Sequence, residues 1–153
     1  MIRIEIPQRG LFEFQHAVFD INGTLAVDGK PLPNVADALK SLAALLSIHL
    51  LTAGTHGNLK ELEETLGFPL QIINNGDEKA WYVQQLGPDK VIAFGNGAND
   101  AGMLRQAAIG IAVLAAEGVA ISALHAADLL APGPIEAIEL VLKTKRLVAT
   151  LRG

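Results

Sequence analysis

The sequence predicts a doubly wound α/β fold, in which a mostly parallel sheet carries helices on both faces. Two observations support this. Short apolar runs alternate along the chain with segments of helical periodicity, and small, glycine-rich loops follow several of the apolar runs. The length of 153 residues suits one hydrophobic core, and the chain contains no linker, low-complexity segment or repeat. We therefore expect one domain over 1–153, with a core over 16–150 and a β-hairpin extension over 1–15.

The expected elements follow in order from the N-terminus. Isoleucines alternate with charged residues over 2–6, and the turn over 7–10 leads into further apolar positions, which predicts a β-hairpin. Short apolar runs predict core strands over 16–20, 48–52, 70–74, 91–94, 109–113 and 128–130. Helical spacing predicts helices over 35–46, 59–66, 77–86, 100–107, 117–125 and 135–147. Asn34, which follows a proline, is the expected N-cap of the first helix.

The composition excludes several classes of protein. Half of the residues are hydrophobic and only 18% are charged, which excludes an intrinsically disordered chain. The net charge is −4 and no basic run occurs, so neither nucleic acid nor an anionic membrane surface is an expected partner. The chain has no cysteine, which excludes disulfides and thiol chemistry, and no apolar stretch approaches the roughly 20 residues of a membrane span. We expect a cytoplasmic protein.

Three loops after expected strands carry the candidate functional residues. Ligands of doubly wound sheets bind beyond the carboxyl ends of the strands, where the strand order reverses. The loops at these ends are Asp20-Ile-Asn-Gly-Thr24, Thr52-Ala-Gly-Thr55 and Gly95-Asn-Gly-Ala-Asn-Asp100. They are small, polar and rich in glycine, which allows the backbone to approach an anion closely. The sequence therefore predicts an anion site at this edge.

These loops resemble motifs of the haloacid dehalogenase (HAD) superfamily. The segment Asp20–Thr24 resembles its D-x-D-x-T nucleophile loop, and Gly95–Asp100 resembles its G-D-G-x-N-D metal loop. The two segments are especially similar to the phosphorylation domain of P-type ATPases and to small soluble P-type-ATPase-like proteins. The resemblance covers about Ala17 to Leu130. It implies a Rossmann-like sheet and a phosphohydrolase or phosphotransferase that works through an aspartyl phosphate.

The resemblance also implies a role for each matching residue at the phosphoryl group. Asp20 is the expected nucleophile, because a carboxylate can attack phosphorus and divide one hard displacement into two easier ones. Thr52 and Lys79 complete the expected catalytic set. The expected phosphate-binding positions are Gly23, Thr24, Thr52, the backbone of Ala53 and Lys79. Lys90 is the rival cation, at the entrance of a strand, and His56 is the histidine that could reach the pocket.

A Mg²⁺ ion is the cofactor that the resemblance implies. Its expected ligands are the Asp20 carboxylate, the backbone carbonyl of Asn22, and Asn96 and Asp100 of the metal loop. Each motif also has a purely structural alternative. Asp20 could cap the following turn, Gly23 and Thr24 could form only a turn, and Asp100 could be the N-cap of the next helix.

Two asparagines depart from the phosphatase pattern. Asn22 occupies the position of the acid–base aspartate of HAD phosphatases, and an amide cannot exchange a proton at neutral pH, where such help is worth about 10²–10⁴-fold. Asn96 occupies the position of a usual Mg²⁺-binding aspartate, so the site loses one negative charge. Two hypotheses therefore stay open: a slow Mg²⁺-dependent phosphohydrolase, and a non-catalytic HAD-like domain that binds a phosphorylated ligand or a protein partner.

The sequence leaves no room for an inserted cap domain. Between Thr24 and Pro33 there is space only for a small flap around Asp28-Gly29, and the interval from Thr52 to Lys79 holds one helix and one strand. We therefore expect an open pocket, so that either the phosphorylated substrate is large or macromolecular, or another subunit covers the site. The apolar N-terminal hairpin adds the expectation of a homo-oligomer.

Overall fold

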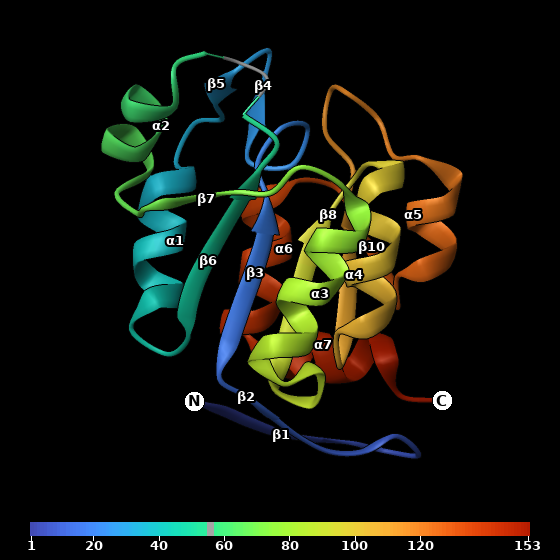
Figure 1. Ribbon diagram of the computed structural model, residues 1–153. Helices are drawn as coiled ribbons and strands as arrows, with labels where there is room; N and C mark the ends of the chain where they lie inside the picture. The colour runs from blue at the N-terminus through green and yellow to red at the C-terminus, as the bar shows by residue number, and fades with distance from the viewer. Residues whose placement is uncertain (55–56) are drawn as a thin grey trace.

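The computed structural model describes residues 1–54 and 57–153, so the expectation for His56 lies outside the described residues. A six-stranded parallel sheet runs through the centre in the order β10-β9-β8-β3-β6-β7 (Figure 1). Its strands are β3 (His16–Asp20), β6 (Ser47–Thr52), β7 (Leu70–Ile72), β8 (Val91–Gly95), β9 (Ile109–Val113) and β10 (Leu129–Ala131). The chain leaves the central strand β3 in one direction and later returns to its other side. The predicted doubly wound fold is confirmed, and the strand order reverses at β3.

Helices cover both faces of the sheet (Figure 1). They are α1 (Val35–Ala43), α2 (Leu59–Leu66), α3 (Gly76–Leu86), α4 (Ala101–Gln106), α5 (Ile121–Ala126), α6 (Pro134–Leu142) and α7 (Thr144–Leu151). Helices α1 and α6 pack on the face that contains Phe19 and Leu50, whereas α3, α4 and α5 pack on the face that contains Val18 and Leu51. Burial on both faces explains why the core strands are continuous apolar runs. None of the described helices is long and apolar enough to cross a membrane.

The N-terminal hairpin forms as the alternating sequence predicts. Strands β1 (Ile2–Ile6) and β2 (Gly10–Phe14) pair antiparallel in a sheet of their own. The side chains of Ile2, Ile4 and Ile6 are buried in the same cluster as Leu147 and Leu151 of α7. These isoleucines are therefore covered by this chain itself, whereas Leu11 of the hairpin stays 54% exposed.

A second, very short hairpin is all that separates β3 from α1. Strands β4 (Ala26–Val27) and β5 (Lys30–Pro31) pair antiparallel around Asp28 and Gly29. Both turn residues have positive φ, 53° and 77°, as a tight hairpin turn of this kind requires. The described residues thus contain the expected small flap at this position, and they contain no cap domain there.

Several element boundaries differ from the expectations. Asn34 occupies the expected N-cap position of α1, but it has a φ of 67° and its side chain makes no capping hydrogen bond. The helix expected over 117–125 begins only at Ile121, after a loop over 114–120. The closing helix is divided into α6 and α7 at Lys143, whose φ of −107° and ψ of 69° interrupt it.

Candidate active site

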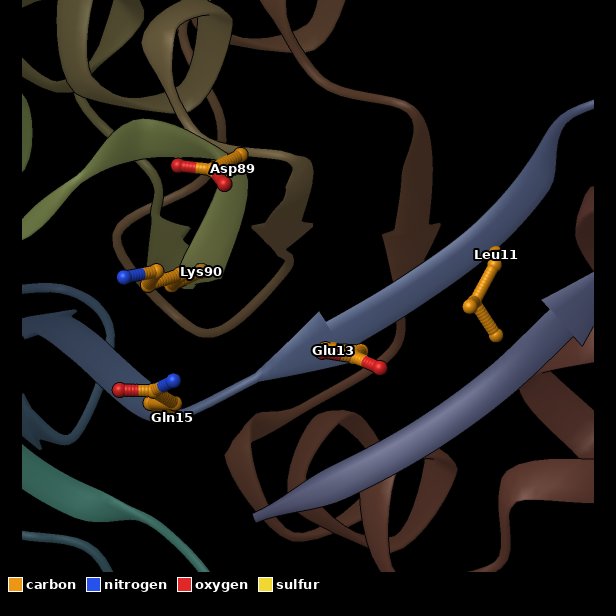
Figure 2. Close-up of a pocket in the computed structure, with 5 residues that line it drawn as sticks. All are labelled: Leu11, Glu13, Gln15, Asp89 and Lys90. Atoms are coloured by element: carbon orange, nitrogen blue, oxygen red, sulfur yellow. The ribbon is translucent and has the colours of Figure 1, made fainter.

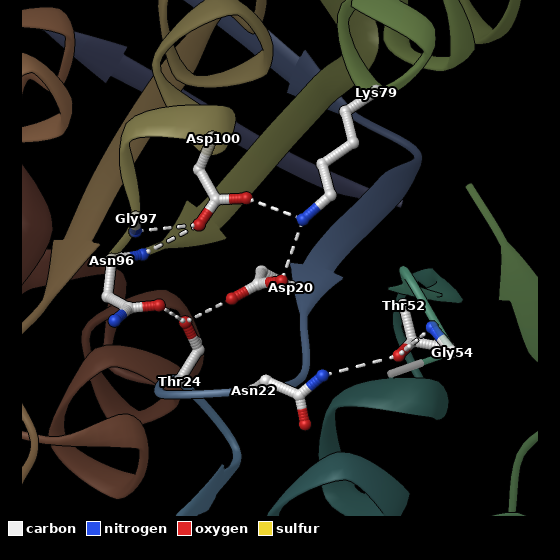
Figure 3. A network of polar contacts seen from close by, with 9 residues as sticks. All are labelled: Asp20, Asn22, Thr24, Thr52, Gly54, Lys79, Asn96, Gly97 and Asp100. Carbon is white, nitrogen blue, oxygen red and sulfur yellow. Dashed lines mark hydrogen bonds and ion pairs between the residues drawn. The ribbon is translucent and has the colours of Figure 1, made fainter. Parts of the chain in front are cut away.

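The three loops singled out in the sequence meet at one edge of the sheet. Strand β3 lies between β6 and β8 and pairs with both in parallel, with Asp20 opposite Leu51 and Phe19 opposite Phe94. The three strands therefore end side by side, and the residues that follow them converge (Figure 3). Asp20, Thr24, Thr52, Lys79 and Asp100 are all buried at this position. Polar side chains gather there at the point where the strand order reverses.

Asp20 is the central carboxylate of this group. Its Oδ1 atom accepts a hydrogen bond from Lys79 Nζ at 2.7 Å, and its Oδ2 atom accepts one from the Thr24 hydroxyl at 3.2 Å. Burial raises the pKa of Asp20 to about 7, and the nearby charge of Asp100 adds to this increase, while Lys79 and Thr24 oppose it. Near neutral pH the carboxylate is therefore poised between its protonated and ionised forms.

Lys79 lies between two carboxylates. It belongs to the first turns of α3, a helix that begins after Asn75, whose side chain accepts a hydrogen bond from the Glu78 N–H. From there the Lys79 ammonium contacts Asp20 Oδ1 and Asp100 Oδ1, each at 2.7 Å. Burial alone would lower the pKa of Lys79, but the two carboxylates outweigh burial and raise it. The side chain is thus a buried, fixed cation.

The rival cation, Lys90, lies elsewhere. It ends the short 3₁₀ turn Pro88–Lys90 and lines a surface hollow of about 310 Å³, together with Leu11, Glu13, Gln15 and Asp89 (Figure 2). This hollow lies beside the N-terminal hairpin and the amino end of β8, at the opposite end of the sheet from Asp20. The structure thus places Lys79, and not Lys90, beside the expected nucleophile.

Asp100 is held more tightly than an ordinary helix cap. Its Oδ2 atom accepts hydrogen bonds from the N–H groups of Asn96 and Gly97, at 3.0 and 2.9 Å, while Oδ1 receives Lys79. Gly95 makes this possible, because a Cβ atom there would lie 2.7 Å from the carboxylate carbon of Asp100. The carboxylate therefore both closes the loop after β8 and fixes Lys79, so its structural and electrostatic roles coexist.

Gly23 and Thr24 form the tight turn that follows Asp20. Gly23 has a φ of 83°, and a Cβ atom there would overlap the Asn96 side chain, so both the conformation and the space require glycine. The Thr24 hydroxyl lies 3.2 Å from Asp20 Oδ2 and also 3.2 Å from Asn96 Oδ1. Its single hydrogen can serve only one of them. When Asp20 is protonated at Oδ2, it can donate to Thr24, and Thr24 can then donate to Asn96.

Thr52 and Asn22 form the opposite side of the site. The Thr52 hydroxyl accepts hydrogen bonds from the Gly54 N–H at 3.2 Å and from Asn22 Nδ2 at 3.4 Å. In both bonds the hydroxyl accepts, so they leave its hydrogen for another oxygen. Ala53, the expected backbone donor, is half-buried and directly follows β6. Asn22 Oδ1 is buried without a hydrogen-bond partner among the described residues, which is an unusual cost in a folded protein.

Asn96 lies in the site, but the structure gives its amide other partners. Besides the bond from Thr24, its Nδ2 atom donates to the carbonyl oxygen of Gly118 at 3.1 Å. The contact to Gly118 and the bond between Asn22 and Thr52 were both missed in the sequence. The first joins residues 22 positions apart and the second joins residues 30 positions apart, each pair from different loops, and no local sequence pattern predicts such contacts. The only indication in the sequence was the residue type, because the amide of an asparagine can both donate and accept hydrogen bonds and so can join two loops.

The donor set at this edge fits a hard cation such as Mg²⁺. The available groups are oxygens: the carboxylates of Asp20 and Asp100, and the amide oxygen of Asn22, which none of the described residues contacts as a hydrogen-bond donor. The fit is a sparse one, because the described residues contain no cluster of three or more His, Cys, Asp or Glu side chains. With both carboxylates ionised, two negative charges and one ammonium leave a net charge of −1. These oxygen ligands therefore support weak binding of Mg²⁺, with most of its ligand positions filled by water.

Comparison with known proteins identifies the class. A model of the haloacid dehalogenase-like hydrolase family matches residues 54–127. An uncharacterized protein of Methanocaldococcus jannaschii is 38% identical over 63 residues, which cover 41% of this chain and 68% of that protein. With this match, the fold and the motif order, the chain belongs to the haloacid dehalogenase-like hydrolases, and the resemblance to the HAD superfamily is confirmed.

Solved structures extend the likeness over nearly the whole fold. The 3-deoxy-D-manno-octulosonate 8-phosphate phosphatase of Moraxella catarrhalis, solved with magnesium, phosphate and the sugar acid KDO, has a TM-score of 0.67 at 16% identity. That match covers 91% of this chain and 94% of the phosphatase. A zinc-transporting PIB-type ATPase in its E2.Pi state has a TM-score of 0.65 at 24% identity, over 78% of this chain and 20% of the ATPase. At these identities the likeness establishes the fold.

Proposed function

We propose that this protein is a Mg²⁺-dependent phosphohydrolase in which Asp20 attacks the phosphorus atom of a phosphorylated substrate. As the bond between an Asp20 oxygen and phosphorus forms, the bond from phosphorus to the leaving oxygen breaks, and the leaving oxygen keeps the electron pair. Water then attacks phosphorus in the aspartyl phosphate, which releases phosphate and restores the carboxylate. Division into two displacements lowers the barrier of each.

One observation carries this proposal: the Lys79 ammonium bridges Asp20 and Asp100 at 2.7 Å inside a buried site. A fixed cation beside the nucleophile offsets the charge on the transferred phosphoryl oxygens, and it costs no reorganisation at the moment of reaction. Thr52 supports the same role, because the hydrogen of its hydroxyl is left for a ligand oxygen. The backbone N–H of Ala53 and the turn at Gly23 and Thr24 complete the proposed phosphate site.

We further propose that Mg²⁺ is held by the Asp20 carboxylate, the backbone carbonyl of Asn22, and the metal loop. The ion would neutralise negative charge between the nucleophile and the phosphoryl group. Within the metal loop we assign Asp100 the main share, directly or through water. Asn96 contributes less than an aspartate would, because its amide oxygen carries no negative charge.

Turnover is proposed to be slow. Asn22 cannot donate a proton to the leaving oxygen or take one from the attacking water. In this respect the site is P-type-ATPase-like, as the sequence resemblance implies.

The substrate is proposed to be a phosphorylated molecule that reaches the site past only the β4–β5 flap, whether small like the sugar phosphate of the Moraxella enzyme or larger. A cytoplasmic location and a homo-oligomer remain predictions, the latter to be checked by light scattering.

The alternative is a non-catalytic HAD-like domain that binds a phosphorylated ligand or a protein partner. Asn22 Oδ1, which has no hydrogen-bond partner among the described residues, favours this reading, because a buried acceptor could bind a donor of a ligand that is held but not converted. Beryllium fluoride with Mg²⁺ separates the two functions, since it mimics a phosphoryl group on a competent aspartate. We expect trapping at Asp20, observed by fluorine NMR, and none in Asp20→Asn.

A steady-state assay completes the test. Hydrolysis of p-nitrophenyl phosphate with Mg²⁺ is expected for the natural sequence and is expected to vanish in Asp20→Asn, which keeps the shape of the side chain but not its nucleophilicity. Full turnover in that variant would rule out the covalent mechanism. Fluoride trapping without any hydrolysis would favour the binding domain.

A further inference from the structure

The loop over 114–120, here called the rim loop, lies beside the proposed active site. It connects the carboxyl end of β9 to α5, and it rises from the same end of the sheet as the β4–β5 hairpin (Figure 1). Its backbone is tied at both ends, by the Leu114 N–H to the Ala131 carbonyl at 2.9 Å and by the Ala120 N–H to the Asn96 carbonyl at 2.8 Å. Between them lies Gly118, in a left-handed conformation with a φ of 78°.

Asn96 holds this loop with its side chain as well as its backbone. The amide Nδ2 donates to the Gly118 carbonyl at 3.1 Å, while Oδ1 lies 3.2 Å from the Thr24 hydroxyl in the loop after Asp20. A carbonyl oxygen can only accept, so the group that faces Gly118 must be a donor. An aspartate here would lack that donor and would set a negative oxygen against the carbonyl. An asparagine at position 96 therefore suits the rim loop, because it provides a hydrogen-bond donor that an aspartate would lack.

The packing around Asn96 leaves the amide little freedom. The side chain is only 8% exposed, and it occupies the space in which a Cβ atom of Gly23 would otherwise lie. The amide is thus wedged between the turn after Asp20 and the rim loop. A buried group in such a position cannot exchange one partner for another without movement of a loop.

We propose that Asn96 is a positioning residue, which fixes the rim loop as one wall of the substrate site. This inference rests on the proposed phosphohydrolase activity and adds a determinant of substrate binding to it. The rim loop carries an exposed Glu117 next to Gly118, and its position decides how the part of the substrate beyond the phosphoryl group is accommodated. Asn96 acts through the loop and does not itself react.

Two substitutions test the inference by different routes. Asn96→Asp removes the donor to Gly118 while it keeps the size of the side chain, and Gly118→Ala strains the backbone that presents the carbonyl. Amide hydrogen exchange by NMR reports on the anchor without any need for catalysis. We expect exchange of the Ala120 amide to become roughly threefold to tenfold faster in both variants, the range for one hydrogen bond. The Leu114 amide, bonded to Ala131, is the reference within the same loop.

Kinetics at saturating Mg²⁺ test the role in substrate binding. For both variants we expect KM for p-nitrophenyl phosphate to rise by a similar factor while kcat changes less, because the nucleophile and Lys79 stay in place. Gln106→Glu is the control, since it adds the same charge at an exposed side chain at the carboxyl end of α4, outside the three loops of the site, and it should leave exchange and KM unchanged. Unaltered Ala120 exchange in both variants would overturn the inference, and so would a fall in kcat at constant KM. Failure of the natural sequence to hydrolyse any substrate would refute the proposed function. The exchange data would still show whether Asn96 fixes the rim loop.

Discussion

At the scale of single residues, the site is governed by how three buried charges share a small volume. Asp20 and Asp100 both contact Lys79 at 2.7 Å, so one ammonium compensates two carboxylates. The remaining imbalance is relieved by protonation of Asp20, whose pKa burial raises to about 7. Near neutral pH a proton on Asp20 would therefore oppose its action as the proposed nucleophile, and a bound cation would favour loss of that proton.

This leads to a prediction about stability and pH. The raised pKa means that the folded protein binds more protons at Asp20 than the unfolded chain between about pH 4 and pH 7. Its contribution to stability is therefore present at low pH and is lost as the pH rises through 7. In EDTA, the stability of Asp20→Asn relative to the natural sequence should increase from pH 5 to pH 8, by on the order of a few kcal/mol. Urea unfolding at both values measures it.

The control for this experiment is Asp37→Asn, at an exposed position in the first turn of α1. Its effect on the free energy of unfolding should be no more than about 0.5 kcal/mol, as is usual for exposed surface positions. An equal effect of Asp20→Asn at pH 5 and pH 8 would mean that Asp20 is ionised throughout, and that the burial argument overstates the cost of its charge.

Asn22 carries the prediction about chemistry. Asn22→Asp supplies a group that can protonate the leaving oxygen and activate water, and a graft without tuned surroundings should gain roughly tenfold to a hundredfold in kcat. The change also removes the Nδ2 donor to Thr52, but the Thr52 hydroxyl can then donate to the new carboxylate. Hydrolysis of p-nitrophenyl phosphate at saturating Mg²⁺ measures the gain. No increase in a folded variant would favour the binding-domain alternative.

At the scale of elements, the sequence predicted those elements whose formation depends on local patterns, and it did not predict those that depend on contacts with distant residues. The core strands and α3 were predictable because periodicity and turn residues are local. The rim loop was not, because its residues read as a helix and the loop is held from outside by Asn96. The break between α6 and α7 at Lys143 was likewise not predictable, because no glycine or proline marks it in the sequence. In the site, the motif residues were predictable, whereas the partners of Asn22 and Asn96 depend on tertiary structure.

Gly110 gives a prediction about how α4 is placed on the sheet. It lies within β9, and a Cβ atom there would collide with the backbone carbonyl of Leu104 in α4. Its N–H also donates to Asp128 Oδ2 at 2.8 Å. Gly110→Ala should therefore push the helix from the strand and destabilise the protein by about 1–3 kcal/mol. Thermal unfolding measures the loss.

The matched control is Gly57→Ala, where an added Cβ atom meets nothing within 4 Å among the residues that the structure describes. It should change stability by no more than about 0.5 kcal/mol, as is usual for open surface positions. If Gly110→Ala were equally harmless, α4 would have to move without cost. A glycine would then not be required for its close approach to β9.

At the scale of the whole molecule, the N-terminal hairpin is more closely integrated than an extension over 1–15 suggests. Four of its side chains, Ile2, Ile4, Ile6 and Phe14, are buried in the cluster that also contains Phe19 and Phe94. Arg9 at its turn donates to Asp128 Oδ1 at 2.7 Å, and the other oxygen of Asp128 holds the Gly110 N–H. The hairpin thus closes the end of the molecule opposite the active site, as the position of β1 and α7 shows in Figure 1.

Deletion of residues 1–14 tests whether the hairpin belongs to the core. Loss of three buried isoleucines and one phenylalanine removes about 1.5–3 kcal/mol per side chain, a sum comparable with the whole stability of a domain. We therefore expect the shortened chain to lose cooperative unfolding or to fall far in Tm, although its active-site residues are all retained. Ile4→Val, which removes one methylene, should cost only about 0.5–1.5 kcal/mol and gives the graded comparison. A shortened chain with an unchanged, cooperative transition would show that residues 15–153 fold without the hairpin. Because the hairpin buries its apolar face against α7, that outcome would also require the newly exposed face of α7 to be covered by a second molecule, which light scattering of the shortened chain would detect.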